Sequence, residues 1–479
     1  MGAQRSLLHR EERRPEELPT SKHKSKHTSN PIGSKIVRMG YFTTTTIRPK
    51  VLMKAFCFSL LIALMGNARG IAADISRGEA ERLIEAGVAP LRTAPPAEGL
   101  ADWTDELVAD KPRFGTLPIR DKAMPFAVVA KGDASAETGR ALFICMHGGG
   151  QDASQTGPHT WGVNSREFET QVAFAVRLYE PDGIYFIPRM ADDRLGRWWH
   201  AHNQIALDRV IDHALLHWGV DPNRVYLLGV SEGGYGTDIL APFMADRWAG
   251  AGAMAAGVGL ANPPANLRNV AFRTDVGEAD LMFDRMPMAK AFHEELDRLR
   301  DFDPDGYNHS INIQPGRGHG IDYGQGIVWI EKHRRDPWPR RVVWVNQTLD
   351  GVRRERFYWL AMPEITEPGD FLVDATADKT ANTITIEAFK LQGTNRDGNR
   401  THGADDVARS PRESAAGHRI DLLLNDRWID LDRPIKVVCN DQTVFEGTAK
   451  RDADLITREL TKRPDAETCP IARLTITVP

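Results

Sequence analysis

Residues 224–237 read RVYLLGVSEGGYGT. The apolar run Val225–Val230 predicts a strand buried on both faces, and the residues after it predict a helix. Between them Ser231 stands in a G-x-S-x-G pentapeptide, the pattern of a nucleophile elbow. A serine on so sharp a turn has a strained backbone, which small neighbours such as Gly229 and Gly233 tolerate. Ser231 is therefore a candidate nucleophile, and an ordinary tight turn with a surface serine is the alternative.

The chain around this stretch alternates short apolar runs with longer segments of helical period, from about residue 120 to 335. The expected strands are 125–131, 141–146, 183–188, 224–230, 250–257, 269–275 and 310–315. The expected helices are 165–180, 204–219, a helix after Ser231, 288–300 and 326–335. Buried strands that alternate with helices predict the α/β class, with a mostly parallel sheet covered by helices.

Past residue 340 the pattern changes to short β-branched runs separated by turn residues. This pattern predicts a C-terminal all-β, sandwich-like accessory domain over residues 338–479. The α/β domain is expected over residues 120–337. Residues 74–119 are expected to form a linker and an N-terminal helical segment.

The first 73 residues have the composition of a basic disordered extension followed by a signal peptide. Its core is placed at residues 53–73, where Lys54 precedes the apolar stretch Ala55–Met65 and small residues follow. We expect Met53 to be the true start and the protein to be secreted or periplasmic, with no stable membrane span after cleavage. An uncleaved anchor with a basic tail is the alternative.

The composition of the 479 residues is that of an ordinary globular protein, with 41% hydrophobic and 26% charged residues. The formal net charge of −4 with interspersed signs gives no indication of a nucleic-acid partner. None of the four cysteines forms a C-x-x-C pair, which argues against a cysteine-rich zinc site. In an exported protein Cys439 and Cys469 could form a disulfide, although sequence cannot show that their geometry permits it.

A glycine-rich loop, His147–Gly150, follows the expected strand 141–146. Glycines at such a position let backbone N–H groups point inward without obstruction, as an oxyanion hole requires. A phosphate-binding loop is the alternative, but no G-x-x-x-x-G-K pattern accompanies these residues.

A histidine and an acid complete the chain order Ser, Asp, His that the elbow motif requires. His319 follows the last expected strand of the α/β domain and has glycines on both sides. Asp280 fits best as the acid, because it lies a few residues past the preceding strand. Asp275 is the alternative acid, and Glu278 is a more distant third.

Residues 120–335 resemble the α/β-hydrolase superfamily, near its secreted serine esterase and polyhydroxybutyrate depolymerase branch. The matching residues are His147–Gly150, Gly229–Gly233, Asp280 and His319, in the family's order. The resemblance covers under half of the chain. It implies a Ser231–His319–Asp280 triad that needs no metal and no organic cofactor, with His319 as the base and Asp280 orienting it.

The oxyanion hole and the substrate pocket are expected close to the triad. The backbone N–H groups of Glu232 and of Gly149 (or Gly148) are the expected oxyanion donors. The site should lie beyond the carboxyl ends of the strands, where Trp198 and Trp199 are expected to form an aromatic pocket wall. Packing of one tryptophan under the next helix is the equal alternative. Gln151 could touch substrate, although a role in stabilising the loop is the simpler interpretation.

These features predict an exported serine hydrolase that cleaves carboxylic esters of small molecules or polymers through an acyl-enzyme on Ser231. A peptidase of the prolyl-oligopeptidase kind is a second hypothesis, weakened because nothing before residue 120 could form a β-propeller. A non-catalytic protein that binds carbohydrate, with its C-terminal domain in contact with the sugar, is the third. The intact Ser, His and acid set argues against it.

Overall fold

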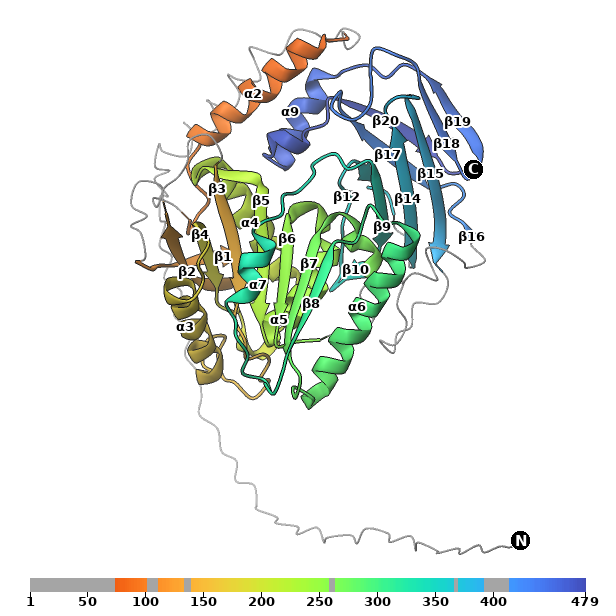
Figure 1. The fold of residues 1–479 in the computed structure, drawn as a ribbon. Coiled ribbons are helices and arrows are strands. Elements are labelled where there is room, and N and C mark those ends of the chain that lie inside the picture. The colour runs from red at the N-terminus through yellow and green to blue at the C-terminus, as the bar shows by residue number, and fades with distance from the viewer. Residues whose placement is uncertain (1–73, 101–110, 133–138, 258–262, 366–368, 392–412) are drawn as a thin grey trace, which may run out of the picture. The chain divides into compact units, whose positions relative to one another are not determined.

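The computed structural model describes residues 74–100, 111–132, 139–257, 263–365, 369–391 and 413–479. Its main sheet has the order β1-β2-β4-β3-β5-β6-β7-β8 (Figure 1). The strands are β1 (Arg113–Ile119), β2 (Lys122–Lys131), β3 (Arg140–Met146), β4 (Gly183–Pro188), β5 (Val220–Val230), β6 (Gly250–Met254), β7 (Ala271–Gly277) and β8 (His309–Gln314). β2 pairs antiparallel with β1 and β4, and the pairs from β4 to β8 are all parallel. The predicted mostly parallel sheet is confirmed. The expectation of a linker and helical segment over residues 74–119 is wrong for β1, which pairs with β2 at the edge of the sheet.

Helices cover both faces of this sheet, as the sequence predicts. They are α3 (Gly162–Arg177), α4 (Ala201–His217), α5 (Glu232–Phe243), α6 (Arg285–Phe302) and α7 (Gln325–Ile330). Side chains alternate between the faces of a strand, so β3 contributes Leu142 and Ile144 to a core with α4, α5 and α6. Phe143 and Cys145 of the same strand join a second core with α3 and α7. Burial on both faces explains why these strands are continuous apolar runs.

The C-terminal segment forms β-sheets, as predicted, but also one helix that was not expected. A six-stranded sheet has the order β19-β18-β15-β14-β9, with β16 paired to β15, and a four-stranded sheet has the order β12-β13-β17-β20. Their strands, with the hairpin β10-β11, are β9 (Arg341–Asn346), β10 (Thr348–Leu349), β11 (Val352–Arg353), β12 (Arg356–Phe357), β13 (Leu360–Ala361), β14 (Asp370–Asp378), β15 (Thr383–Leu391), β16 (Glu413–Ser414), β17 (Arg419–Leu424), β18 (Ile435–Cys439), β19 (Gln442–Gly447) and β20 (Ala472–Thr477).

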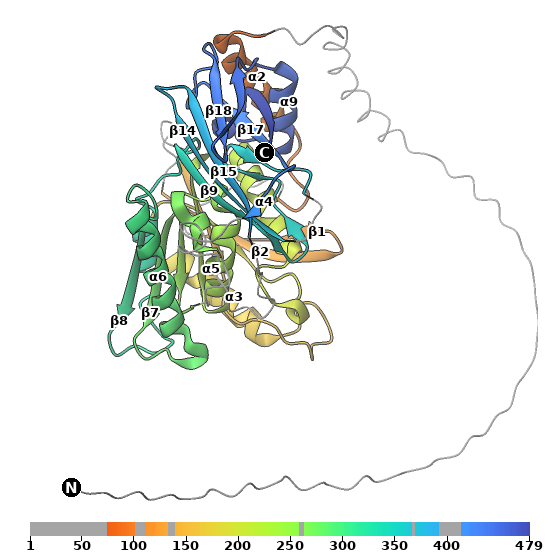
Figure 2. The same ribbon diagram turned by 90° about the vertical axis from the view of Figure 1, so that its right-hand side faces the viewer.

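The unexpected helix is α9 (Ala453–Lys462), so the prediction of an all-β segment is wrong for this element. Asp452 caps it by accepting hydrogen bonds from the amides of Asp454 and Leu455. Leu455, Ile456 and Leu460 are its buried apolar residues, at helical spacing. α9 packs against α2 (Arg77–Thr93), far from it in sequence, and both views show the two side by side (Figures 1 and 2).

Five short 3₁₀ helices complete the described elements: η1 (Asp193–Leu195), η2 (Ala245–Arg247), η3 (Pro264–Asn269), η4 (Met282–Asp284) and η5 (Ala466–Thr468). Residues 70–479 form one compact unit. Trp344 of β9 and Phe357 of β12 belong to the same apolar core as α4 and α5. The C-terminal sheets therefore cover one face of the α/β region, and the boundary predicted between residues 337 and 338 stays a prediction.

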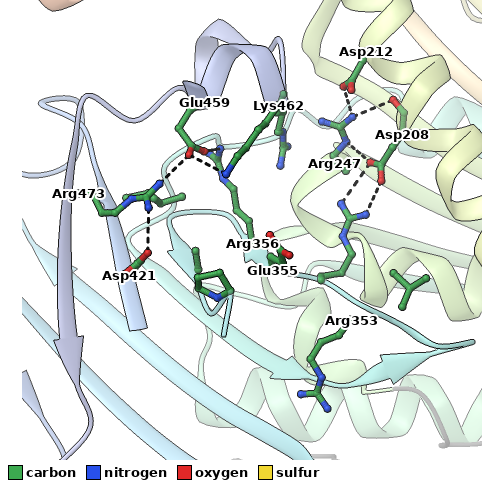
Figure 3. Close-up of a pocket in the computed structure, with 16 residues that line it drawn as sticks. Asp208, Asp212, Arg247, Arg353, Glu355, Arg356, Asp421, Glu459, Lys462 and Arg473 are labelled. Carbon is green, nitrogen blue, oxygen red and sulfur yellow. Dashed lines mark hydrogen bonds and ion pairs between the residues drawn. The ribbon is translucent and has the colours of Figure 1, made fainter. Parts of the chain in front are cut away.

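A charged cavity of about 360 Å³ lies where these two regions meet, and Figure 3 shows its side chains. Asp208 of α4 pairs with Arg247 and with Arg354. On the α9 side, Glu459 accepts a hydrogen bond from Arg473 at 2.9 Å. None of the lining residues is a site residue predicted from the sequence. The cavity therefore belongs to the junction, where charged groups neutralise one another.

A buried ion pair also crosses this junction. Arg335 Nη2 lies 2.7 Å from Asp465 Oδ2, and both side chains are at most 2% exposed. Burial alone raises the pKa of Asp465, but Arg335 and Arg463 outweigh it and hold the pKa below its ordinary value. Because the folded-state pKa is depressed, the stabilisation is present at neutral pH and is lost as the pH falls below the ordinary carboxyl range.

Three further predictions concern a disulfide, a membrane span and the signal peptide. Cys439 and Cys469 are both free and buried, so the possible disulfide between them is not formed. Cys439 ends β18 in the six-stranded sheet, whereas the Sγ atom of Cys469 faces the carbonyl of Ile456 in α9. No helix among the described residues is long and apolar enough to cross a membrane. The predicted signal peptide at 53–73 lies outside the described residues.

We expect Asp465→Asn to lower the free energy of unfolding by about 3–5 kcal/mol, because it leaves the buried Arg335 without a charge partner. Glu467→Gln is the matched control. Glu467 pairs with Arg427 at the surface, where an ion pair contributes about 1 kcal/mol or less. Chemical denaturation of both variants measures the difference. Equal losses would show that the buried pair has no special part in stability.

Candidate active site

The serine of the elbow stands between the last residue of β5 and the first residue of α5. Ser231 has φ 55° and ψ −112°, a conformation that non-glycine residues rarely adopt. Close backbone contacts surround it: a Cβ on Gly229 would lie 2.1 Å from the carbonyl oxygen of Gly233. A Cβ on Gly233 would lie 2.1 Å from the carbonyl oxygen of Met146 in β3. Both glycines of the motif are therefore required by the packing.

His319 and Asp280 reach the serine from the loops after β8 and β7. These two strands are adjacent and parallel, so their loops leave the same edge of the sheet. His319 Nε2 lies 3.0 Å from Ser231 Oγ, and His319 Nδ1 lies 2.7 Å from Asp280 Oδ2. The imidazole is 44% exposed, whereas the carboxylate is 2% exposed. The structure thus brings the three residues predicted from the sequence into one chain of hydrogen bonds.

The two alternative acids have other partners. Asp275 lies within β7, fully buried, and accepts hydrogen bonds from Arg273 Nε at 2.8 Å and Asn312 Nδ2 at 2.7 Å. Glu278 accepts a hydrogen bond from the amide of Gly316 at 2.9 Å. These contacts make Asp275 and Glu278 supports of the sheet edge and of the loop. Of the three acids, Asp280 is the one in contact with His319.

Arg285, which the sequence analysis did not consider, holds the acid from its other side. Its Nη1 donates to Asp280 Oδ1 at 3.1 Å, and its Nε donates to the hydroxyl of Tyr235 at 2.7 Å. Both oxygens of Asp280 therefore have a donor, which fixes the plane of the carboxylate. Arg285 begins α6, five residues after Asp280 in an irregular segment, and no pattern in the sequence indicates its role.

The glycine-rich loop lies against the serine, as predicted. A Cβ on Gly148 would be 3.4 Å from Cβ of Ser231. His147, fully buried, accepts a hydrogen bond from the amide of Met190 at Nε2 and contacts the carbonyl of Gly148 through Nδ1. Burial lowers the pKa of His147 to about 3, so a neutral ring with its proton on Nδ1 suits both contacts. His147 is a support of the loop.

The conformation of the loop is locked by Asn164 of α3, a residue the sequence analysis missed. Its Oδ1 accepts from the amide of Gly150, and its Nδ2 donates to the carbonyl of Gly150, both at 3.0 Å. Nδ2 also donates to Asp193. Gly149 and Gly150 have φ values of +99° and +138°, in the region that favours glycine. A Cβ on Gly149 would lie 2.1 Å from Asn164 Oδ1.

Glu232 contributes a backbone amide and a buried carboxyl group at this site. It is the first residue of α5, where the backbone N–H has no partner within the helix. Ser231, by contrast, uses its own amide in a hydrogen bond to the carbonyl of Met254. Burial raises the pKa of the Glu232 carboxyl to about 7, against the opposing effect of Arg197, which donates to Oε2.

The three residues predicted to line the substrate pocket differ in their burial and in their contacts. Trp198 is fully buried and donates from Nε1 to the carbonyl of His147 at 3.0 Å, so its prediction as an open pocket wall is wrong. The alternative, a packed tryptophan, describes it. Trp199 is half-buried, and the Arg197 guanidinium carbon lies 5.7 Å from its ring centroid. Gln151 is exposed after the glycine-rich loop. A substrate role of Trp199 and Gln151 stays a prediction.

The strand order of the main sheet, and the turn at Ser231 between β5 and α5, identify the fold of the region from β1 to α7. This is the α/β-hydrolase fold. Within the described residues, no group of three or more His, Cys, Asp or Glu side chains is arranged to hold a metal ion.

No family model and no curated protein matches the chain. Among solved structures it is similar to a thermostable esterase, at 16% identity and a TM-score of 0.35, over 48% of this chain and 64% of that one. A poly(3-hydroxybutyrate) depolymerase from Bordetella parapertussis matches at 14% identity and a TM-score of 0.35, over 49% and 94%. The feruloyl esterase module from Clostridium thermocellum matches at 15% and 0.32, over 47% and 88%.

The chain thus spans less than two thirds of the length of the first of these structures. Likenesses of this strength carry no activity over to this chain. The function is therefore inferred from the geometry of the site.

We expect Gly149→Ala to lower the free energy of unfolding by about 1–3 kcal/mol, because the new methyl group meets Asn164 and the backbone has a positive φ. Gly318→Ala is the control, since a Cβ there meets nothing within 4 Å and the φ of Gly318 is not in that region. Its effect should stay within about 0.5 kcal/mol. Chemical denaturation compares the two, and equal stabilities would contradict the locked loop.

Proposed function

We propose that this protein is a serine hydrolase that cleaves carboxylic esters through an acyl-enzyme on Ser231. The observation that carries the proposal is the chain of hydrogen bonds from Ser231 Oγ through His319 to Asp280, built on a strained turn at the end of β5. A nucleophile, a base in hydrogen-bond reach and a third group that orients the base are the parts required for covalent catalysis by a serine.

In the first step, the hydroxyl of Ser231 attacks the ester carbonyl while His319 Nε2 takes the proton from Oγ. Asp280 accepts a hydrogen bond from Nδ1–H, which selects the productive tautomer and stabilises the imidazolium that forms. Arg285 prevents Asp280 from rotating away. The protonated ring then gives its proton to the leaving alcohol as the C–O bond breaks.

The negative charge on the carbonyl oxygen is stabilised by backbone amides. We assign this role to the amide of Glu232, the residue after Ser231, and to that of Gly149 or Gly148, in the loop whose Gly148 lies against Ser231. The N-terminus of α5 adds a favourable partial positive charge. Each such donor contributes about 10²–10³-fold to the rate. Water, activated by the same histidine, attacks the acyl group and regenerates the serine.

The proposal includes export of the protein, which rests on the composition of residues 53–73. A peptidase of the prolyl-oligopeptidase kind is the second candidate, because a triad of the same geometry can also cleave a peptide bond. A carbohydrate-binding protein without catalysis would not need a base and an acid aligned on its serine, as His319 and Asp280 are. Both alternatives are outcomes of the experiment that follows.

We expect Ser231→Ala to abolish hydrolysis of p-nitrophenyl acetate and labelling by a fluorophosphonate probe. Asp280→Asn should lower kcat by about 10⁴-fold, because the amide favours the wrong tautomer of His319. Glu278→Gln, in the same loop, is the matched control and should keep most activity.

Activity retained in Ser231→Ala would remove the nucleophile from the proposal. Faster cleavage of aminoacyl anilides than of esters by the native protein would favour the peptidase. A folded native protein that neither hydrolyses esters nor reacts with the probe would favour the binding protein.

A further inference from the structure

Three consecutive apolar side chains are exposed directly after the acid of the candidate triad. Leu281, Met282 and Phe283 are 57%, 66% and 71% exposed. They make up half of the large hydrophobic residues that are exposed in the described part of the chain. The others are Phe114, Leu195 and Phe302. Single exposed apolar residues are ordinary, but a contiguous group is typical of a binding surface.

The backbone of this segment does not explain why its residues are apolar. Phe283 (φ 57°, ψ 26°) and the next residue, Asp284 (φ 55°, ψ 28°), are both in the left-handed region. That region disfavours bulky residues, and glycine or asparagine would form the same turn at lower cost. An aromatic residue that is both strained and exposed is therefore a candidate for a binding role.

The segment is also held in place. The amide of Asp284 donates to the carbonyl of Leu281 at 3.0 Å, and the amide of Met286 donates to the carbonyl of Asp280 at 3.1 Å. The Arg285 guanidinium carbon lies 5.0 Å from the centroid of the Phe283 ring. Nη1 of the same group donates to the carboxylate of Asp280. A single side chain thus connects the exposed ring to the acid that orients His319.

We propose that Leu281–Phe283 form the surface that binds the apolar acyl part of an ester whose carbonyl is attacked by Ser231. This inference rests on the proposed function and adds the substrate class, esters of medium-length aliphatic or aromatic acids. The segment lies close to the site, because Leu281 follows Asp280 in the chain and Arg285 contacts both the Phe283 ring and the Asp280 carboxylate. Backbone hydrogen bonds and the contact with Arg285 hold the segment, so binding an acyl chain there costs little conformational entropy.

The test is the chain-length preference of the native protein and of two variants. We expect Phe283→Ser and Met282→Ser each to lower the ratio of kcat/KM for p-nitrophenyl octanoate to kcat/KM for p-nitrophenyl acetate by about 10-fold or more. Phe302→Ser, which removes an exposed phenylalanine from the other end of α6, is the control and should leave the ratio unchanged. Labelling rates of Ser231 with long- and short-chain fluorophosphonates give a second measure that does not require turnover.

An unchanged ratio in both variants, or equal losses with both esters, would overturn the assignment while leaving the esterase proposal intact. A change in oligomeric state with no change in the ratio would also overturn it and would assign the surface to a second copy of the chain. Absence of both hydrolysis and labelling in the native protein would instead remove the proposed function and this inference with it.

Discussion

The candidate site depends on the close backbone packing around Ser231. The serine has a positive φ, and the two flanking glycines lie where a Cβ would come within 2.1 Å of carbonyl oxygens. Because Gly233 packs against the carbonyl of Met146, the helix α5 begins directly beside the strand β3 that leads into the glycine-rich loop. The contact between Gly233 and Met146 thus brings together the hydroxyl group of Ser231, the first amide of α5 and the glycine-rich loop. A side chain at Gly229 or Gly233 would push these groups apart.

The second requirement is that loops far apart in sequence leave the same edge of the sheet. The parallel strands β5, β7 and β8 have their carboxyl ends at one edge, which brings Ser231, Asp280 and His319 together across 88 residues of chain. Three side chains support these groups. Arg285 donates to the acid, Asn164 accepts from the amide of Gly150 in the glycine-rich loop, and Trp198 donates to the carbonyl of His147 at the start of that loop. These supports fix the positions of the acid and of the glycine-rich loop.

Much of this arrangement follows from patterns that a sequence displays directly. Continuous apolar runs predict seven of the eight strands of the main sheet, and the G-x-S-x-G context predicts Ser231. β1 was missed, because it lies in residues 74–119 and most of its residues are exposed or partly buried. The choice of Asp280 over Asp275 depended on the distance from the end of β7, and Asp275 instead meets Arg273, two residues away on the same strand. The supports could not be predicted in this way. Asn164, Arg285 and Trp198 act through contacts between remote elements, which have no period or motif, and α9 is a short helix among strands.

The shared core between α4 and the C-terminal sheets has a consequence for synthesis of the protein. Trp344 and Phe357 belong to the same apolar core as residues of α4, and Asp465 neutralises Arg335. Because Asp465 lies close to the C-terminus, Arg335 has no counter-charge until almost the whole chain has been translated. The α/β region therefore completes its buried ion pairing only when nearly the whole polypeptide has emerged, and a nascent chain that stalls before residue 465 leaves Arg335 without its partner.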